Sequence, residues 1–308
     1  MSNRYVDPTN DVIFKKIFSD KDRLIDFLNA VLRLEKGKKI ETIDFIPQEE
    51  LPSFKSGRRS IFDIKCTDQL KKTYIVEMQN RPETSFLNRV QCYAAHTFVS
   101  QVKKGETHDD LMPVILLSLT GRTLFDKEVD CISYHLNVES KTQKRYLFSL
   151  SYVFIELPKF KKKAEDLKSI EDEWLYFFAE WNKTQEPPPT IKDPFVLEAY
   201  NAIEQFNLTE SEYDAYLRSR LGQEADELMM NKTISESIEK GEKIGIEKGE
   251  KIGIEKGEKI GIEKGEKLNA QKTARKMIKK KMDIETIVDF TGLTHAEIEN
   301  LIKEEKPE

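Results

Sequence analysis

The chain has 308 residues, of which 38% are hydrophobic and 34% charged, and its formal net charge is −5. This length allows one domain of ordinary size with a large appendage, or two modest domains. The negative net charge excludes attraction to nucleic acid by the field of the whole protein, so any DNA contact would need a local basic patch.

Membrane and secreted proteins are disfavoured by the pattern of the chain. No stretch approaches the roughly 18 consecutive apolar residues of a membrane span, and residues 1–10 lack the layout of a secretory signal. Cys66, Cys92 and Cys131 form no Cys-x-x-Cys pair, which argues against a disulfide framework and a thiolate zinc site. We therefore expect a cytoplasmic protein with no membrane partner.

The N-terminal half alternates between helical and strand periodicity. Apolar residues at helical spacing, such as Phe14 and Phe18, predict helices at 11–18, 23–34 and 86–104. Short segments rich in Ile, Phe, Tyr, Val and Leu predict strands at 39–46, 60–66, 73–79, 113–119, 131–138 and 146–157. This order of elements indicates an α/β domain at residues 1–159.

Beyond this domain the sequence predicts only helices. Trp174, Phe177, Phe178 and Trp181 at helical spacing indicate a helical extension at 160–237. The remaining two predicted segments are a repeat and a small helical hairpin, at 238–269 and 270–308.

An eight-residue unit, Ile-Glu-Lys-Gly-Glu-Lys-Ile-Gly, occurs three times from residue 238 and a fourth time with Leu268-Asn269 at its end. Glycine therefore falls at every fourth position from Gly241 to Gly265, which in a helix makes a slowly winding groove that a second helix can approach. Each glycine costs roughly 0.8–1 kcal/mol of helix propensity, so a flexible charged linker and a self-associating helix both remain open. Association through 238–269 would make a homo-oligomer.

The C-terminal hairpin begins its last helix with a capping box formed by Thr294 and Glu297. A helix-turn-helix module would need a basic recognition helix, but residues 294–305 are acidic on balance. We therefore favour packing or oligomerisation for this segment.

Two neighbouring predicted strands each carry a carboxylate among apolar residues, Asp63 in the first and Glu77 in the second. Burying a carboxylate without compensation costs several kcal/mol, so the pair needs a cation, a hydrogen-bond network or an open cleft. Mg²⁺ meets that need, because it takes oxygen ligands and is commonly held by one or two carboxylates plus substrate phosphate. Asp63, Glu77 and the carbonyl of Met78 would be its ligands. The alternative is that both carboxylates lie on solvated faces.

Several motifs occur in the order found in one known family. They are the run Asp7-Pro8-Thr9-Asn10-Asp11-Val12-Ile13-Phe14-Lys15-Lys16-Ile17-Phe18, Leu28-Asn29-Ala30-Val31-Leu32, Asp63, Glu77-Met78-Gln79, and Arg89 with Tyr93 on the following helix. Together they resemble the Rpn family of recombination-promoting nucleases and transposases, which belongs to the PD-(D/E)XK superfamily. The resemblance covers residues 5 to about 157, and Met282-Asp283-Ile284 and Thr291-Gly292-Leu293-Thr294 also resemble the family's C-terminal ends.

The resemblance implies a restriction-endonuclease-like mixed sheet flanked by helices, with an all-helical C-terminal extension. It also implies a metal-dependent DNA endonuclease associated with recombination or transposition, using Mg²⁺ or Mn²⁺. Asp63 and Glu77 become metal ligands and Gln79 takes the place of the superfamily's lysine, while Asp11 is a further acidic candidate.

Gln79 departs from the superfamily pattern, because an amide lacks the positive charge by which lysine stabilises the transition state. It can still orient a water molecule by hydrogen bonding. The alternative hypothesis is therefore a weakly active or inactive nuclease fold that binds DNA or assembles through its repeat. Lys15, Arg58 and Arg59 flank the expected cleft as candidates for phosphate contact.

Overall fold

The computed structural model describes residues 4–34, 37–47, 63–80, 83, 85–102 and 108–305. The chain divides into two compact units, Met1–Met230 and Asn231–Glu308, and each unit has a hydrophobic core of its own. Within the described ranges, no helix combines the length and the apolar character needed to cross a membrane.

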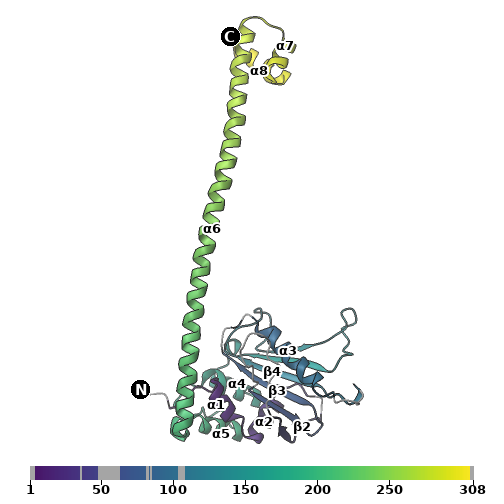
Figure 1. Cartoon of the computed structure of the whole chain (residues 1–308), viewed down its shortest axis with the longest axis vertical. Helices are drawn as coiled ribbons and strands as arrows, with labels where there is room; N and C mark the ends of the chain where they lie inside the picture. Colours follow the sequence, from purple (N-terminus) through teal and green to yellow (C-terminus); the bar gives the residue numbers. More distant parts are fainter. Residues whose placement is uncertain are drawn as a thin grey trace. The chain divides into compact units, whose positions relative to one another are not determined.

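A six-stranded mixed sheet forms the centre of the first unit (Figure 1). Its strand order is β1-β2-β3-β4-β6-β5. The central pairs β3–β4 and β4–β6 are parallel, whereas the outer pairs are antiparallel. The strands are β1 (Ile43–Phe45), β2 (Ile64–Asp68), β3 (Thr73–Gln79), β4 (Val114–Thr120), β5 (Ile132–Leu136) and β6 (Leu150–Glu156).

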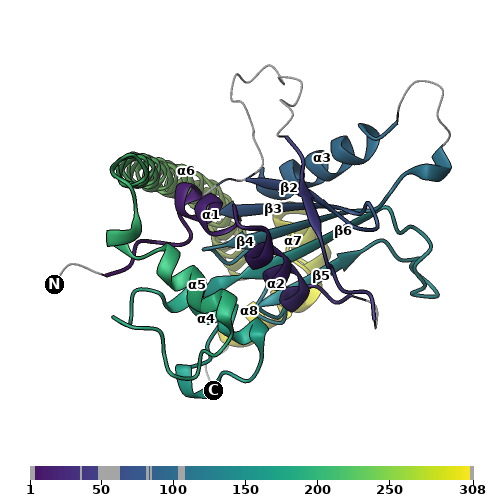
Figure 2. The same ribbon diagram turned by 90° about the horizontal axis from the view of Figure 1, so that it is seen from below.

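Helices cover both faces of this sheet, with α3 on one face and α1, α2, α4 and α5 on the other (Figure 2). Their bounds are α1 (Asp11–Ile17), α2 (Lys21–Val31), α3 (Phe86–Val99), α4 (Ile170–Glu180) and α5 (Pro194–Ala202). Short 3₁₀ turns lie at His108–Asp110, Leu157–Lys159, Ala164–Asp166 and Gln205–Asn207. The expected α/β class with a mixed sheet is confirmed.

Helices α4 and α5 contribute to the same core as α1 and α2. Trp174 of α4 is fully buried, with its ring centroid 5.8 Å from that of Phe18 and 5.4 Å from that of Phe27. Its indole Nε1 donates a hydrogen bond to Asp26 Oδ2 at 2.8 Å. The boundary expected at residue 159 therefore remains a prediction, while the core itself extends across it.

Some element ends differ from the sequence-based expectation. The strand expected at 146–157 begins only at Leu150, because Tyr146, Leu147 and Phe148 are exposed in a loop and make no ladder. The helix expected at 86–104 ends at Val99. Residues 60–62 of an expected strand lie outside the described residues.

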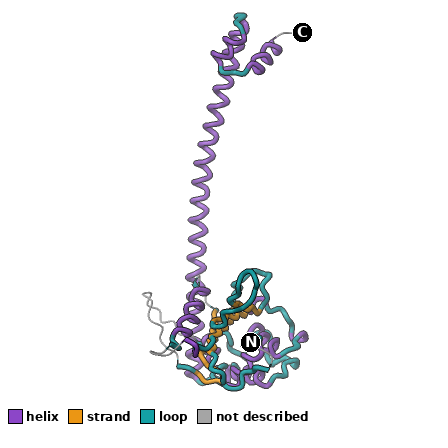
Figure 3. The backbone as a smooth tube through the Cα atoms, turned by 90° about the vertical axis from the view of Figure 1, so that its right-hand side faces the viewer, coloured by secondary structure: helices purple, strands orange, loops and turns teal. Residues whose placement is uncertain are grey.

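The repeat at 238–269 lies entirely within a single helix, α6 (Glu210–Lys279). Figure 3 shows the helical backbone continuing without interruption through it. Every described side chain of the repeat is exposed, including Ile244, Ile252 and Ile260. The second unit closes with the last turns of α6, α7 (Ile284–Thr291) and α8 (His295–Glu305). These three helices pack around Ala274, Ile287, Leu293, Ile298 and Leu301.

Candidate metal centre

The N-terminal turn is tied to the end of β3 and so fixes the position of α1. Asp7 Oδ1 accepts hydrogen bonds from the backbone N–H and the hydroxyl of Thr9, at 2.8 and 2.6 Å. Asn10 caps α1 by accepting from the N–H of Val12. Asn80 Nδ2, just after β3, donates to the carbonyl and hydroxyl oxygens of Thr9 at 2.7 and 2.6 Å. The first helix is thereby held beside the end of the sheet.

Asp63 and Glu77 stand opposite each other at the point where the β2–β3 ladder ends. The antiparallel register pairs Ile64 with Val76, and one further step brings Asp63 opposite Glu77. Asp63 does not extend the ladder; instead its Oδ2 accepts a hydrogen bond from the backbone N–H of Met78 at 2.8 Å. Its Oδ1 lies 3.3 Å from the Nζ of Lys15 on α1.

Arg89 on α3 joins the polar side chains of β3. Its Nη2 donates to Glu77 Oε1 at 3.1 Å and to Gln79 Oε1 at 2.6 Å. The same nitrogen lies 3.4 Å from Glu83 Oε2. The Cζ of Arg89 lies 5.4 Å from the ring centre of Phe86. One guanidinium thus contacts both Glu77 and Gln79, the two side chains of β3 that the sequence places in the catalytic motif.

Both carboxyl groups hold a proton more tightly than a free carboxyl group does. Burial raises the pKa of Glu77 to about 8, and the negative charges of Asp63 and Asp11 add to this rise while Arg89 opposes it. Burial also raises the pKa of Asp63, against which the Met78 N–H and Lys15 act. Perturbed acids of this kind cluster at functional sites.

The structure thus brings together Asp63, Glu77 and Gln79. Asp11 belongs to the same group, because its charge acts on both carboxyls. Lys15 is also present, as an ion-pair partner of Asp63. The expected phosphate contacts Arg58 and Arg59 lie outside the described residues. Met78 contributes a backbone N–H contact, and its carbonyl as a metal ligand remains a prediction.

The donor set fits a hard divalent cation. Among the described residues, Glu77 Oε2 is buried without a hydrogen-bond partner, so a cation would not have to displace a protein donor from this oxygen. Carboxylate oxygens are the ligands that Mg²⁺ prefers. No described group of three or more Asp, Glu, His or Cys side chains is arranged to hold a metal ion. Lys15 pairs with Asp63, and Arg89 pairs with Glu77. An entering metal ion would have to replace those contacts.

Arg89 is the functional candidate that sequence reasoning left without a role. It lies three residues after Phe86 and four before Tyr93, both of which are buried. A charged residue on the apolar side of an amphipathic helix needs a partner. The position of Arg89 on the apolar side of the helix could have indicated from the sequence that it has a buried partner. The identity of its partners, however, depends on how α3 packs on β3.

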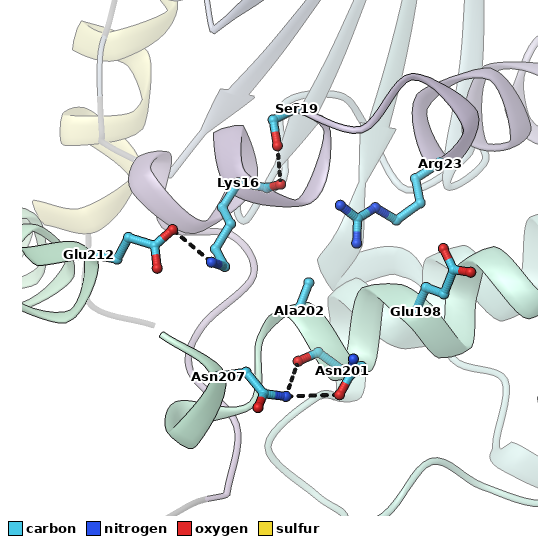
Figure 4. Close-up of a pocket in the computed structure, with 8 residues that line it drawn as sticks. All are labelled: Lys16, Ser19, Arg23, Glu198, Asn201, Ala202, Asn207 and Glu212. Atoms are coloured by element: carbon cyan, nitrogen blue, oxygen red, sulfur yellow. Dashed lines mark hydrogen bonds and ion pairs between the residues drawn. The ribbon is translucent and has the colours of Figure 1, made fainter. Parts of the chain in front are cut away.

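A separate cavity of about 600 Å³ lies elsewhere in the first unit (Figure 4). Lys16 reaches Glu212 across its edge at 2.7 Å, and Asn207 Nδ2 donates to the Asn201 carbonyl at 2.9 Å. Arg23 points toward the cavity from α2. Neither carboxylate of the β2–β3 pair lines it, so it is not part of the candidate metal centre.

The fold and the paired carboxylates define a nuclease-like domain of the PD-(D/E)XK class, and comparison with protein families agrees. The family described as PD-(D/E)XK nuclease family transposase matches residues 8–248, and the chain belongs to it. The C-terminal HTH domain of the Rpn/YhgA-like nuclease family matches residues 267–303. No curated protein and no solved structure matched the chain.

The second match corrects the preference for packing or oligomerisation at the C-terminus. That preference rested on the acidic character of the last helix. A helix-turn-helix fold is instead defined by how its helices pack around a shared core, here around Ala274, Ile287 and Ile298. Gly292 adopts φ +67° in the turn after α7, and its N–H donates to the Val288 carbonyl. This left-handed conformation favours glycine.

Proposed function

We propose that this protein is a Mg²⁺-dependent DNA endonuclease, with Mn²⁺ as an alternative ion, acting in recombination or transposition. The observation that carries the proposal is the facing pair of Asp63 and Glu77, in which a buried oxygen of Glu77 has no partner among the described residues. The match to a nuclease family of transposases supports the reaction class.

Asp63 and Glu77 would hold the cation, with the Met78 carbonyl as a third ligand. The bound ion would neutralise charge on the scissile phosphate and lower the pKa of a water molecule. The hydrogen bond from the Met78 N–H keeps Asp63 in a fixed orientation beside Glu77. Preorganised charge of this kind is often the largest single contribution to catalysis.

Arg89 and Gln79 together would take the role of the superfamily's lysine. Gln79 has no charge, but its Oε1 lies 2.6 Å from a guanidinium nitrogen that is always protonated. Arg89 would supply the positive charge near the phosphate, and Gln79 would orient it. Lys15, with its side chain 44% exposed, would contact an adjacent phosphate once released from Asp63.

The test is cleavage of supercoiled plasmid by purified protein with Mg²⁺, with Mn²⁺ and with EDTA. Asp63→Asn and Glu77→Gln keep the shape of each side chain and remove its charge. The matched control is Asp44→Asn, because Asp44 is 78% exposed and pairs only with Lys21 among the described contacts. The proposal requires metal-dependent nicking by wild type and the control, and its loss in both site variants. Equal nicking by all four proteins would refute it.

A second candidate function is assembly through α6 with little or no cleavage. The glycine row from Gly241 to Gly265 runs along a continuous exposed helix, and no side-chain atom lies within 4 Å of a Cβ built at Gly249, Gly253 or Gly257. The row is flanked by exposed isoleucines such as Ile252 and Ile254. Rows of small residues allow close approach of two helices.

Light scattering on the full chain tests this assembly function. Ile252→Ser with Ile254→Ser should reduce the molar mass of the assembly, while Glu250→Ser with Lys251→Ser leaves it unchanged. A monomeric wild-type protein would remove the candidate. An oligomer that cleaves no DNA under either metal would favour assembly over the endonuclease.

A further inference from the structure

The charge pattern of α6 changes abruptly near its C-terminal end. Residues 239–267 contain eight Glu and eight Lys, so the repeat is neutral overall. Residues 270–282 contain six Lys or Arg and no Asp or Glu. The change coincides with the start of the segment that packs into the C-terminal core, where Ala274 is fully buried.

Three of these cations form one exposed row. Lys272 and Lys276 lie four residues apart on one side of α6, and Lys280, four residues further on, directly follows the last residue of the helix. With 100° per residue, the mean direction of Lys272 and Lys276 is opposite to that of Ala274, which faces the core. All three side chains are exposed. The row extends over about 12 Å of helix.

We propose that this row binds the phosphate backbone of duplex DNA without regard to base sequence. Duplex DNA carries one negative charge per roughly 1.7 Å of axis, so about seven phosphate charges lie along a length equal to that of the row. Lysine contacts with phosphates position a protein on DNA and carry no direct sequence information. The α6 end, and not α8, is therefore the DNA-contacting helix of this domain.

Helix α8 is unsuited to the usual role of a recognition helix. In a helix-turn-helix, the N-terminal residues of the second helix reach the base edges. Here Glu297 Oε2 accepts from both the N–H and the hydroxyl of Thr294, and Glu297 Oε1 pairs with Lys267 Nζ at 2.6 Å. Glu299 is exposed nearby. These carboxylates would repel phosphates on either side of a groove.

Other anionic partners fit the row less well. Single strands are usually bound by basic grooves together with aromatic side chains on which bases stack, and residues 270–282 contain no aromatic residue. A basic helix on a membrane needs an apolar face turned to the lipid. The apolar side of this segment, with Ala274 and Met277, is instead packed in the C-terminal core.

A complementary explanation is that lysines near a helix C-terminus stabilise the helix by offsetting its dipole. That effect is confined to the last turn, which contains Lys276 and Lys279. It gives no reason for Lys272, which lies two turns before the end of α6, or for Lys280, which follows it. Only DNA binding uses the whole row.

The experiment measures fluorescence anisotropy of labelled 20-base-pair duplexes with the full chain in EDTA, over 50–200 mM NaCl. The test variant carries Lys272→Gln, Lys276→Gln and Lys280→Gln. The matched control carries Lys248→Gln, Lys256→Gln and Lys264→Gln, which removes the same charge from exposed positions of the same helix. Because EDTA abolishes metal-dependent cleavage, the result does not depend on the proposed endonuclease activity.

The proposal expects the slope of log K against log salt to fall by about 2.7 in the test variant, at roughly 0.9 per lost phosphate contact. The control should match wild type, and replacing the same three lysines by arginine should preserve the slope. Two duplexes of unrelated sequence should bind alike. An unchanged slope in the test variant would overturn the proposal. So would a clear preference for one of the two duplexes, or binding to phosphatidylserine vesicles as tight as binding to duplex.

Discussion

Glu77 links the stability of the first unit to pH. Its side chain is 6% exposed, and burial together with the charge of Asp63 raises its pKa from 4.5 to about 8. Between these values the folded state keeps the proton and the unfolded state has lost it. The free energy of unfolding therefore falls as pH rises, by about 1.4 kcal/mol per pH unit. The contribution is fully present below pH 4.5 and is lost by pH 8, in total about 5 kcal/mol.

The perturbation is Glu77→Gln, which keeps the shape and removes the titration. The variant still offers an amide oxygen to Arg89, and the stabilising effect of Arg89 on the ionised carboxylate is already included in the pKa of about 8. At pH 8.5 in EDTA the variant should therefore be more stable than wild type, by up to about 5 kcal/mol. At pH 5 the difference should nearly vanish.

The assay is urea unfolding followed by tryptophan fluorescence between pH 5 and 8.5. Both tryptophans, Trp174 and Trp181, lie in the first unit, so the signal reports on that unit alone. Burial also raises the pKa of Asp7 and Asp26, but both remain in wild type and variant and cancel in the difference.

The control for this assay is Glu83→Gln, which removes a partly exposed carboxylate 3.4 Å from the same arginine. It should retain most of the wild-type dependence of unfolding free energy on pH, because the charge of Glu83 comes after burial, Asp63 and Asp11 among the causes that raise the pKa of Glu77. If Glu77→Gln shows the same pH dependence as wild type, the buried and protonated state of Glu77 is refuted, together with the reasoning built on it.

Three further predictions concern the surroundings of the centre and the repeat. Gln79→Lys and Arg89→Gln should each lower plasmid cleavage on the order of 100-fold, because Gln79→Lys places two cations together and Arg89→Gln removes the positive charge. The double variant should recover activity. Failure to recover would show that the two residues do not share a role. Asn80→Ala should lower the free energy of unfolding by about 1–3 kcal/mol, since two hydrogen bonds to Thr9 are lost; an unchanged urea midpoint would contradict this. Gly253→Ala should stabilise α6 by about 0.8–1 kcal/mol and raise its helical circular dichroism on heating, because no atom obstructs the added methyl group; a loss of helicity would contradict it.

The sequence predicted the elements of the first unit well where their periodicity was strong. The alternation around Asp63 and Glu77 predicted that each carboxylate lies among apolar neighbours, and 73–79 matched β3. Alternation cannot give the register between two strands, however. The facing positions of the two carboxylates depend on the pairing of Ile64 with Val76, which is a tertiary property.

Aromatic content misled the sequence argument at the start of β6. Tyr146 and Phe148 suggested a strand, yet both are exposed, and Arg145 bonds the carbonyl oxygens of Leu147 and Phe148 instead. Strand propensity reflects packing against neighbours, and within the described part of the chain no strand pairs with residues 146–148.

Long-range packing explains the remaining omissions. The burial of Trp174 against Phe18 joins segments more than 150 residues apart, which no local pattern reports. Arg89 in the candidate centre is a second example of a contact that no local pattern reports. It lies on α3, whereas its two partners, Glu77 and Gln79, belong to β3. Local patterns thus predicted the acidic residues and left their cationic partner unassigned.

The central claim is that Asp63 and Glu77 form a divalent-metal site, and calorimetric titration with Mn²⁺ tests it most directly. Wild type and Asp44→Asn should bind the ion, with heats that vary with the buffer because ionisation of Glu77 releases a proton on binding. Asp63→Asn and Glu77→Gln should bind at least about 10-fold more weakly. Equal binding by all four proteins, or no binding by wild type, would contradict the account.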